Sequence, residues 1–217
     1  MAIPALDADA DIFVWDKAGQ LLTNVTASDE FDSYALWTAD GRHLIVASNE
    51  VDAQNARLYL RGSDGTGTAE PLTENAPGEA QAPSSLTPDG ARLLFRKGPD
   101  TNFDLVMLSL KGDGGTETLL ETGARELNVE VSPNGRWIAY QSDRSGQYEI
   151  YVSPFPGAAS SQRQVSAAGG TRPGRTYEVD GDGFLLLKEV AADEGSGRRQ
   201  ILVQNWFEEL KRLVPAN

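Results

Sequence analysis

Residues 131–152 read VSPNGRWIAYQSDRSGQYEIYV, and they carry the pattern that decides the fold. A β-prone segment ends at the Asn134-Gly135 pair, and the apolar run Trp137–Tyr140 follows it. Asn-Gly pairs favour tight hairpins because glycine adopts positive φ without steric cost. A loop containing Gly146 then leads to another β-prone segment, Glu149–Val152. The stretch therefore predicts three consecutive antiparallel strands.

The same turn recurs along the chain, at Asp40-Gly41, Asp89-Gly90 and Asp182-Gly183, with a period of about 47 residues. Such periods are typical of propeller blades or of helical pairs. The segments around the turns have no helical periodicity, and short, nearly continuous apolar runs follow each turn, as in strands covered on both faces. These runs are residues 43–47, 92–95, 137–140 and 184–187.

Two further strand-like segments follow in most units, and the outermost is more polar, as at the solvent edge of a blade. We therefore predict an all-β fold, a single β-propeller domain over residues 1–217 with four to five blades of four antiparallel strands. A short helical segment ends the chain. The predicted units are a half blade at 11–27, blades at about 31–75, 80–122 and 125–168, a last blade at 172–205 and a tail helix at 206–214.

Residues 131–152 closely resemble the TolB-type, WD-like bacterial β-propeller repeat. That repeat runs from a Ser-Pro-Asp-Gly turn through a Ser-x-Arg-x-Gly loop to an Ile-Tyr-Val strand, and here Asn134 replaces the Asp and Asp143 precedes Arg144. The segment 153–157 and the tail resemble the C-terminal propeller of large bacterial sensor and kinase-associated proteins. The resemblance implies a bacterial protein, periplasmic or extracytoplasmic within a longer parent. Family members usually have six blades, so a blade is missing here, and residues 171–177 look like the point of loss.

Composition and motifs exclude several functions. The chain has 19 Lys and Arg against 32 Asp and Glu, a net charge of −13 that repels nucleic-acid phosphates. It has no cysteine, no Gly-Lys-Ser/Thr phosphate loop, no Gly-x-Ser-x-Gly nucleophile and one histidine, His43. Apolar runs are far shorter than a membrane span requires, and the N-terminus resembles no secretory signal. We predict no catalytic residue, metal, cofactor, nucleic-acid partner or membrane insertion. These features do not identify the cellular compartment of the protein.

The loops between second and third strands should lie on the same face as the loops between blades, because strand direction alternates. Binding residues concentrate on loops held by a rigid scaffold, and Tyr and Arg are frequent interface anchors. An ordinary solvated rim is the competing interpretation. The candidate binding residues on this face are Tyr34, Arg125, Arg172, Arg175 and Tyr177.

The leading hypothesis is a non-enzymatic interaction module that binds a protein or peptide partner through this face. The alternative is a small-ligand sensor or a calcium-dependent propeller enzyme, of the lactonase or lyase type, that uses the central channel. Self-association through open blade edges is a third hypothesis, because an unpaired strand edge is a template for pairing.

Overall fold

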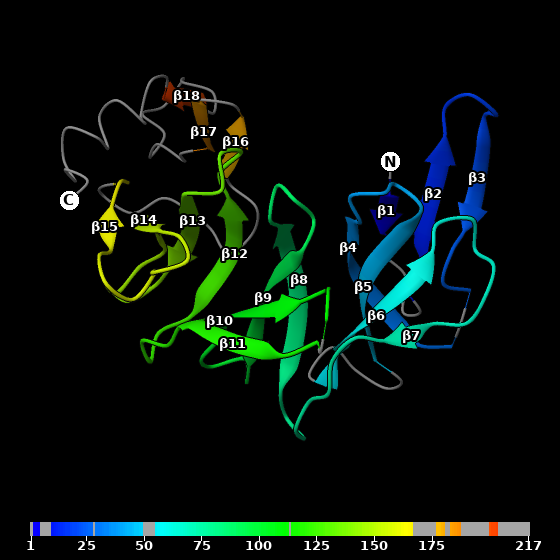
Figure 1. Cartoon of the computed structure of the whole chain (residues 1–217), viewed down its shortest axis with the longest axis horizontal. Coiled ribbons are helices and arrows are strands. Elements are labelled where there is room, and N and C mark those ends of the chain that lie inside the picture. Colours follow the sequence, from blue (N-terminus) through cyan, green and yellow to red (C-terminus); the bar gives the residue numbers. More distant parts are fainter. Residues whose placement is uncertain are drawn as a thin grey trace, which may run out of the picture.

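The computed structural model describes residues 2–4, 10–27, 29–49, 55–112, 114–166, 177–180, 183–187 and 200–203, with side chains described only between residues 10 and 166. These residues form five antiparallel sheets that follow one another around an arc (Figure 1). The sheet β1–β3 lies at one end of the arc and the sheet β16–β18 at the other. Within every sheet, strands that are consecutive in sequence are neighbours in space.

The two end sheets have three strands each and the three central sheets have four. The strands are β1 (Ala2–Pro4), β2 (Ile12–Asp16), β3 (Leu21–Asn24), β4 (Phe31–Trp37), β5 (His43–Asn49), β6 (Arg57–Gly62), β7 (Glu70–Pro71), β8 (Ala80–Leu86), β9 (Arg92–Gly98), β10 (Asp104–Ser109), β11 (Thr116–Leu120), β12 (Glu126–Val131), β13 (Trp137–Ser142), β14 (Glu149–Pro154), β15 (Arg163–Gln164), β16 (Tyr177–Asp180), β17 (Gly183–Leu187) and β18 (Gln200–Val203).

The predicted all-β fold of four-stranded antiparallel blades is confirmed. The N-terminal sheet differs from the expected half blade, because β1 pairs with β2 in the register Ala2 to Val14 and supplies a third strand. The sequence of β1 gives little indication of a strand, and its partner residues in β2 lie eight or more positions further along the chain. A local sequence pattern does not reveal such a pairing. The predicted tail helix, 206–214, lies outside the described residues.

The turns between the first and second strands of the central sheets share one hydrogen-bond pattern. The Thr38 hydroxyl donates to Asp40 Oδ1 at 2.6 Å, and the same oxygen accepts the Arg42 N–H at 2.9 Å. Gly41 has a φ of +66°, which suits glycine because it has no Cβ. Equivalent turns are formed by Thr87, Asp89 and Gly90 and by Ser132, Asn134 and Gly135. The pattern explains these carboxylates as turn-forming groups.

A backbone hydrogen bond links successive sheets at three equivalent places. The N–H groups of Asp32, Gln81 and Glu126, at or near the start of each first strand, donate to the carbonyl oxygens of Ala10, Ala56 and Phe103, each at 2.8 Å. Each acceptor lies just before the third strand of the preceding four-stranded sheet or, for Ala10, before β2. The loops between second and third strands therefore lie beside the loops between sheets, as the alternation of strand direction requires.

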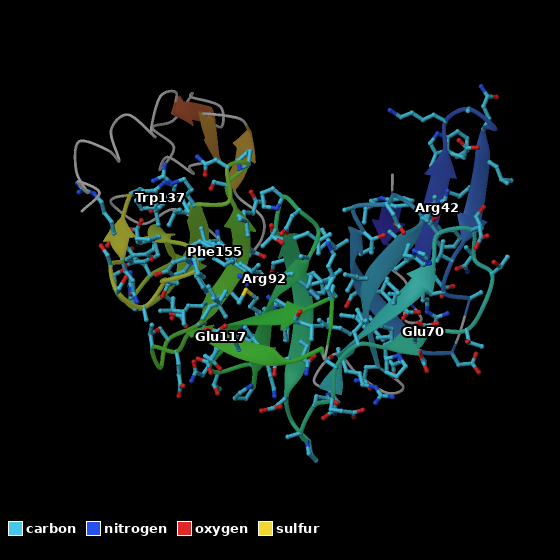
Figure 2. All side chains as sticks on the ribbon, in the orientation of Figure 1. Arg42, Glu70, Arg92, Glu117, Trp137 and Phe155 are labelled. Atoms are coloured by element: carbon cyan, nitrogen blue, oxygen red, sulfur yellow. The ribbon has the colours of Figure 1, made fainter. Side chains whose placement is uncertain are left out.

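The core lies between the sheets. In β5, Leu44 and Val46 pack against Ile12 of the preceding sheet, whereas the intervening Ile45 packs toward Leu93 of the next. In β9, Leu93 and Phe95 belong to the cluster shared with the preceding sheet. Leu94 belongs instead to the cluster shared with Ile138, Tyr140 and Tyr151 of the following sheet. This alternation explains the continuous apolar runs of β5 and β9, because both faces of each of these strands are covered. Figure 2 shows the side chains that occupy these spaces, and it labels Arg92 and Trp137, which begin β9 and β13.

Candidate binding pocket

The first strands of the three central sheets are all irregular near their middle. The register of β4 shifts between Ser33 and Leu36, and that of β12 shifts between Leu127 and Glu130. The register of β8 shifts between Pro83 and Ser85. A bulge of this kind bends a strand and re-aims its side chains, and bulges are frequent beside functional sites.

Two residues at these irregularities have left-handed backbone conformations. Tyr34 has a φ of +54° and Asn128 a φ of +53°, and each stands six residues before the Asp or Asn of its turn. Positive φ is uncommon for residues other than glycine and costs roughly 1–3 kcal/mol, which the surrounding structure has to offset. Tyr34 is nevertheless 52% exposed, so burial of its ring does not explain the conformation.

The bulged strands line a pocket of about 460 Å³. Figure 1 shows β4, β8 and β12 on the inner side of the arc, where the central channel of a propeller lies. Side chains from three sheets contribute to its wall, so the pocket exists only when successive sheets are stacked. Its polar, charged and aromatic lining includes Tyr34, Arg96, Asp100, Phe103, Arg125 and Glu130.

Aromatic rings and guanidinium groups alternate along one wall of the pocket. Arg96 Nη2 donates to the Tyr34 hydroxyl at 3.0 Å, and its guanidinium carbon lies 4.9 Å from the centre of the Tyr34 ring. The same group lies 4.7 Å from the centre of the Phe103 ring, and the Arg125 guanidinium lies 5.7 Å from that ring centre. Contacts of this kind orient the guanidinium groups through the ring quadrupole. We call these four residues the Tyr34–Arg125 stack.

The two arginines of the stack have polar groups with unused hydrogen-bonding capacity. The Nε atoms of Arg96 and Arg125 are buried and have no hydrogen-bond partner within the part of the chain that the structure describes. Over the same residues, neither guanidinium forms an ion pair within 4 Å. The Arg125 backbone N–H donates to Asp143 Oδ1 at 2.9 Å, which fixes the start of β12 against the neighbouring loop.

Tyr148 packs behind the stack. It contacts the cluster of Phe103, Ala80 and Leu127, and burial raises the pKa of its hydroxyl, while the positive charge of Arg125 opposes that shift. The ring therefore packs against the cluster that contains Phe103, and the hydroxyl stays neutral at physiological pH.

Two of the five predicted binding residues, Tyr34 and Arg125, lie in this pocket. Tyr177 begins β16, where its backbone pairs with Leu186, and Arg172 and Arg175 lie outside the described residues. Sequence reasoning missed Arg96, Phe103 and Asn128. Alignment of the repeats would have indicated Asn128, which matches Tyr34 in its distance from the turn. Arg96 and Phe103 give no comparable signal, because their contacts cross between sheets.

The remaining candidates for chemistry lie elsewhere. His43 Nδ1 is 3.1 Å from Asp40 Oδ2 on an exposed turn, at the end of β5 opposite the strand two to three loops. Among the described residues, no group of three or more His, Asp or Glu side chains is placed to hold a metal ion. The same described residues include no helix that is long and apolar enough to cross a membrane.

Comparison with known proteins supports the fold. No family model matches the chain. It is 32% identical over 127 residues to an uncharacterized protein of Agrobacterium fabrum, an alignment that covers 58% of this chain and 41% of that protein. Among solved structures, TolB from Acinetobacter baumannii matches with a TM-score of 0.71 and 22% identity, covering 94% of this chain and 49% of that chain.

Two further structures extend the comparison. A putative TolB from Agrobacterium tumefaciens has a TM-score of 0.55 and 20% identity, covering 88% of this chain and 81% of that chain. An oligogalacturonate lyase in complex with manganese has a TM-score of 0.64 and 14% identity, covering 90% of this chain and 54% of that chain. The chain thus has a TolB-type β-propeller fold and spans about half the length of the Acinetobacter protein. The same fold occurs in an enzyme, so fold alone does not separate binding from catalysis.

Proposed function

We propose that this chain is a non-enzymatic binding module whose pocket receives a short segment of a protein or peptide partner. The observation that carries the proposal is the Tyr34–Arg125 stack. Tyr34 lies on the bulged strand β4 and Arg96 on β9, and Phe103 and Arg125 directly precede β10 and β12. Tyr and Arg are enriched among residues that dominate binding energy at protein interfaces. A volume of about 460 Å³ lies within the usual range for ligand pockets, and side chains already held in place lose less entropy on binding.

The proposal extends to residues beyond the described pocket. Arg172, Arg175 and Tyr177 precede or begin the first strand of the next sheet, and Arg125 likewise directly precedes the first strand of its own sheet. We expect them to continue the contact surface on the same face, around the mouth of the pocket.

Selection of random displayed peptides against the purified chain tests this function. Peptides selected on the wild type should bind Tyr34→Ala at least tenfold more weakly, about 1.4 kcal/mol, because the substitution removes the outer ring of the stack. Leu22→Ala is the matched control, because Leu22 is also 52% exposed and lies in β3, away from the pocket. Selected peptides that bind Tyr34→Ala as tightly as the wild type would contradict the proposal.

Native mass spectrometry and sedimentation separate the two rival hypotheses. A divalent cation or small molecule retained by the purified chain would favour a sensor or an enzyme that uses the channel, for which the likeness to the lyase structure is the supporting observation. Association that increases with protein concentration and is lost in Leu22→Asp would favour pairing through the exposed edge at β3, where Leu21 is 61% exposed.

A further inference from the structure

We propose that the ligand of the pocket carries a carboxylate, which the guanidinium groups of Arg96 and Arg125 bind from the pocket wall. This inference rests on the function proposed above and specifies the chemistry of the partner: an acidic peptide segment that presents either an Asp or Glu side chain or a C-terminal carboxylate.

The two positive charges are held close together by one ring. Both guanidinium groups contact Phe103, at 4.7 and 5.7 Å from its centre, and both line the same pocket. Both groups are positively charged, and the low dielectric of a partly buried site strengthens the repulsion between them. A carboxylate bound in the pocket attracts both groups and offsets that repulsion.

Three other cations of this acidic chain each have an acidic partner. Arg57 pairs with Glu74 at 3.4 Å, Arg61 with Glu30 at 3.9 Å and Lys97 with Glu79 at 3.2 Å. Arg96 and Arg125 have no such acid within 4 Å among the described residues, although the chain carries 32 Asp and Glu. The guanidinium groups carry the N–H donors that a carboxylate oxygen requires. Arginine binds carboxylates through two parallel hydrogen bonds, which gives both strength and orientation.

The rest of the pocket favours a peptide over a bare polyanion. Asp100 and Glu130 also line it, and acids near the two arginines disfavour a ligand that is negatively charged throughout. A peptide carries its carboxylate beside uncharged backbone N–H donors. Phosphate or a chain of uronic acids supplies the negative charge without those donors.

Titration of the ¹⁵N-labelled chain with three blocked tripeptides tests the inference. The probes are acetyl-Ala-Glu-Ala-amide, acetyl-Ala-Gln-Ala-amide and acetyl-Ala-Ala-Ala with a free carboxylate, with inorganic phosphate as a further probe. The glutamate peptide should shift the Nε–H resonances of Arg96 and Arg125 and bind at least tenfold more tightly than the glutamine peptide. The peptide with the free carboxylate reports whether a C-terminus serves as well as a side chain.

Variants assign the effect to the two arginines. Arg96→Gln and Arg125→Gln should each reduce affinity for the glutamate peptide at least tenfold and leave affinity for the glutamine peptide unchanged. Arg125→Lys should restore part of the affinity through its charge. Arg57→Gln is the matched control, because Arg57 lies 4.9 Å from the centre of the Tyr59 ring and donates to its hydroxyl, yet stands outside the pocket.

Three results would overturn the inference. Equal binding of the glutamate and glutamine peptides would show that the pocket does not recognise a carboxylate, while the proposed peptide-binding function would still hold. Tighter binding of phosphate than of any peptide would identify a different ligand class. Absence of any shift at the pocket resonances would also refute the inference, and the display selection would then decide the proposed function by itself.

Discussion

Asp40 and Asp89 have depressed pKa values because their carboxylates accept hydrogen bonds within the turn. For Asp40 the Thr38 hydroxyl is the largest cause, followed by the Arg42 N–H, and together they lower its pKa from 3.8 to about 2. The Thr87 hydroxyl and the Ala91 N–H lower the pKa of Asp89 in the same way. Asn134 makes the same contacts through its amide oxygen and does not titrate. Two of three equivalent turns therefore respond to acid and the third does not.

The ionised form of Asp40 should stabilise the fold in an acid-sensitive way. A folded pKa below the unfolded value of 3.8 means that the contribution is fully present above that value and is lost as pH falls toward about 2. Asp40→Asn should therefore have a flatter dependence of unfolding free energy on pH across this window. Chemical denaturation between about pH 5 and pH 2 measures it, with Asn134→Asp as the converse variant. Identical slopes for Asp40→Asn and wild type would contradict this explanation.

Glu126 shows the opposite shift. Its carboxyl is buried at the start of β12, and desolvation raises its pKa although Oε1 accepts the Thr122 hydroxyl at 2.5 Å and the Ser142 hydroxyl at 2.9 Å. The second oxygen, Oε2, has no partner among the described residues. Gln81 occupies the same repeat position, and its amide accepts the Thr73 hydroxyl and donates to the Glu74 carbonyl. The fold therefore accepts a neutral amide at this site.

We expect Glu126→Gln to stabilise the protein above the raised pKa of Glu126. Ionisation of the buried carboxyl is less favourable in the folded state than in the unfolded state, so the wild type loses stability as pH rises through that pKa. The gain should be about 1 kcal/mol, or roughly 2–4 °C in melting temperature, and should vanish below the unfolded pKa. Thermal unfolding across this pH range measures it. A gain that is equally large in acid would indicate packing rather than charge as its cause.

Among the elements, the turn between β9 and β10 positions Phe103, which lines the pocket. Gly98 has a φ of +146°, and a Cβ at this position would lie 2.3 Å from the Asn102 carbonyl oxygen. The Asn102 N–H donates to the Pro99 carbonyl at 2.9 Å, which closes the turn just before Phe103. Gly98 thus allows the close backbone approach that places Phe103 between the two arginines.

Gly98→Ala should lower the unfolding free energy by about 3 kcal/mol, because it adds a backbone clash to an unfavourable φ. Gly146 is the matched control in the equivalent turn of the next sheet: its φ is +91°, and a Cβ there meets nothing within 4 Å. Gly146→Ala should cost only about 1 kcal/mol, from the left-handed backbone alone. Denaturant unfolding of both variants measures the difference. Equal costs would mean that the 98–102 turn relaxes without penalty.

At the scale of the whole molecule, stability resides between sheets rather than within them. A single sheet has two apolar faces to cover, and each hydrophobic cluster combines residues of neighbouring sheets. Leu94 illustrates this, because it is fully buried in β9 and packs into the cluster that contains Ile138 and Tyr140 of β13. Sheets that depend on each other in this way should unfold together.

Leu94→Ala should destabilise the chain by about 3 kcal/mol through lost burial and the cavity it leaves. The loss should appear equally in fluorescence from Trp37 in β4 and from Trp137 in β13, each measured with the other tryptophans replaced by Phe. Leu22→Ala, at a site 52% exposed, should change stability by no more than about 0.5 kcal/mol. A midpoint that moves for Trp137 but not for Trp37 would show that the sheets unfold independently.

The sequence by itself determined the repeat, the strands and the turns of this protein, because these depend on short-range chemistry. An Asp-Gly or Asn-Gly pair specifies a hairpin wherever it occurs, and a continuous apolar run indicates a strand covered on both faces. Tyr34 and Arg125 could also be selected, since Tyr34 lies in a first strand and Arg125 directly precedes one.

Only the tertiary structure decided what the pocket contains. Arg96 reaches Tyr34 across 62 positions of sequence, and Phe103 meets both arginines because the sheets stack at a particular angle. The bulges at Tyr34 and Asn128, and the pairing of β1 with β2, likewise follow from register between strands. Register and stacking are set by the summed packing of many side chains, and no local pattern encodes such a sum.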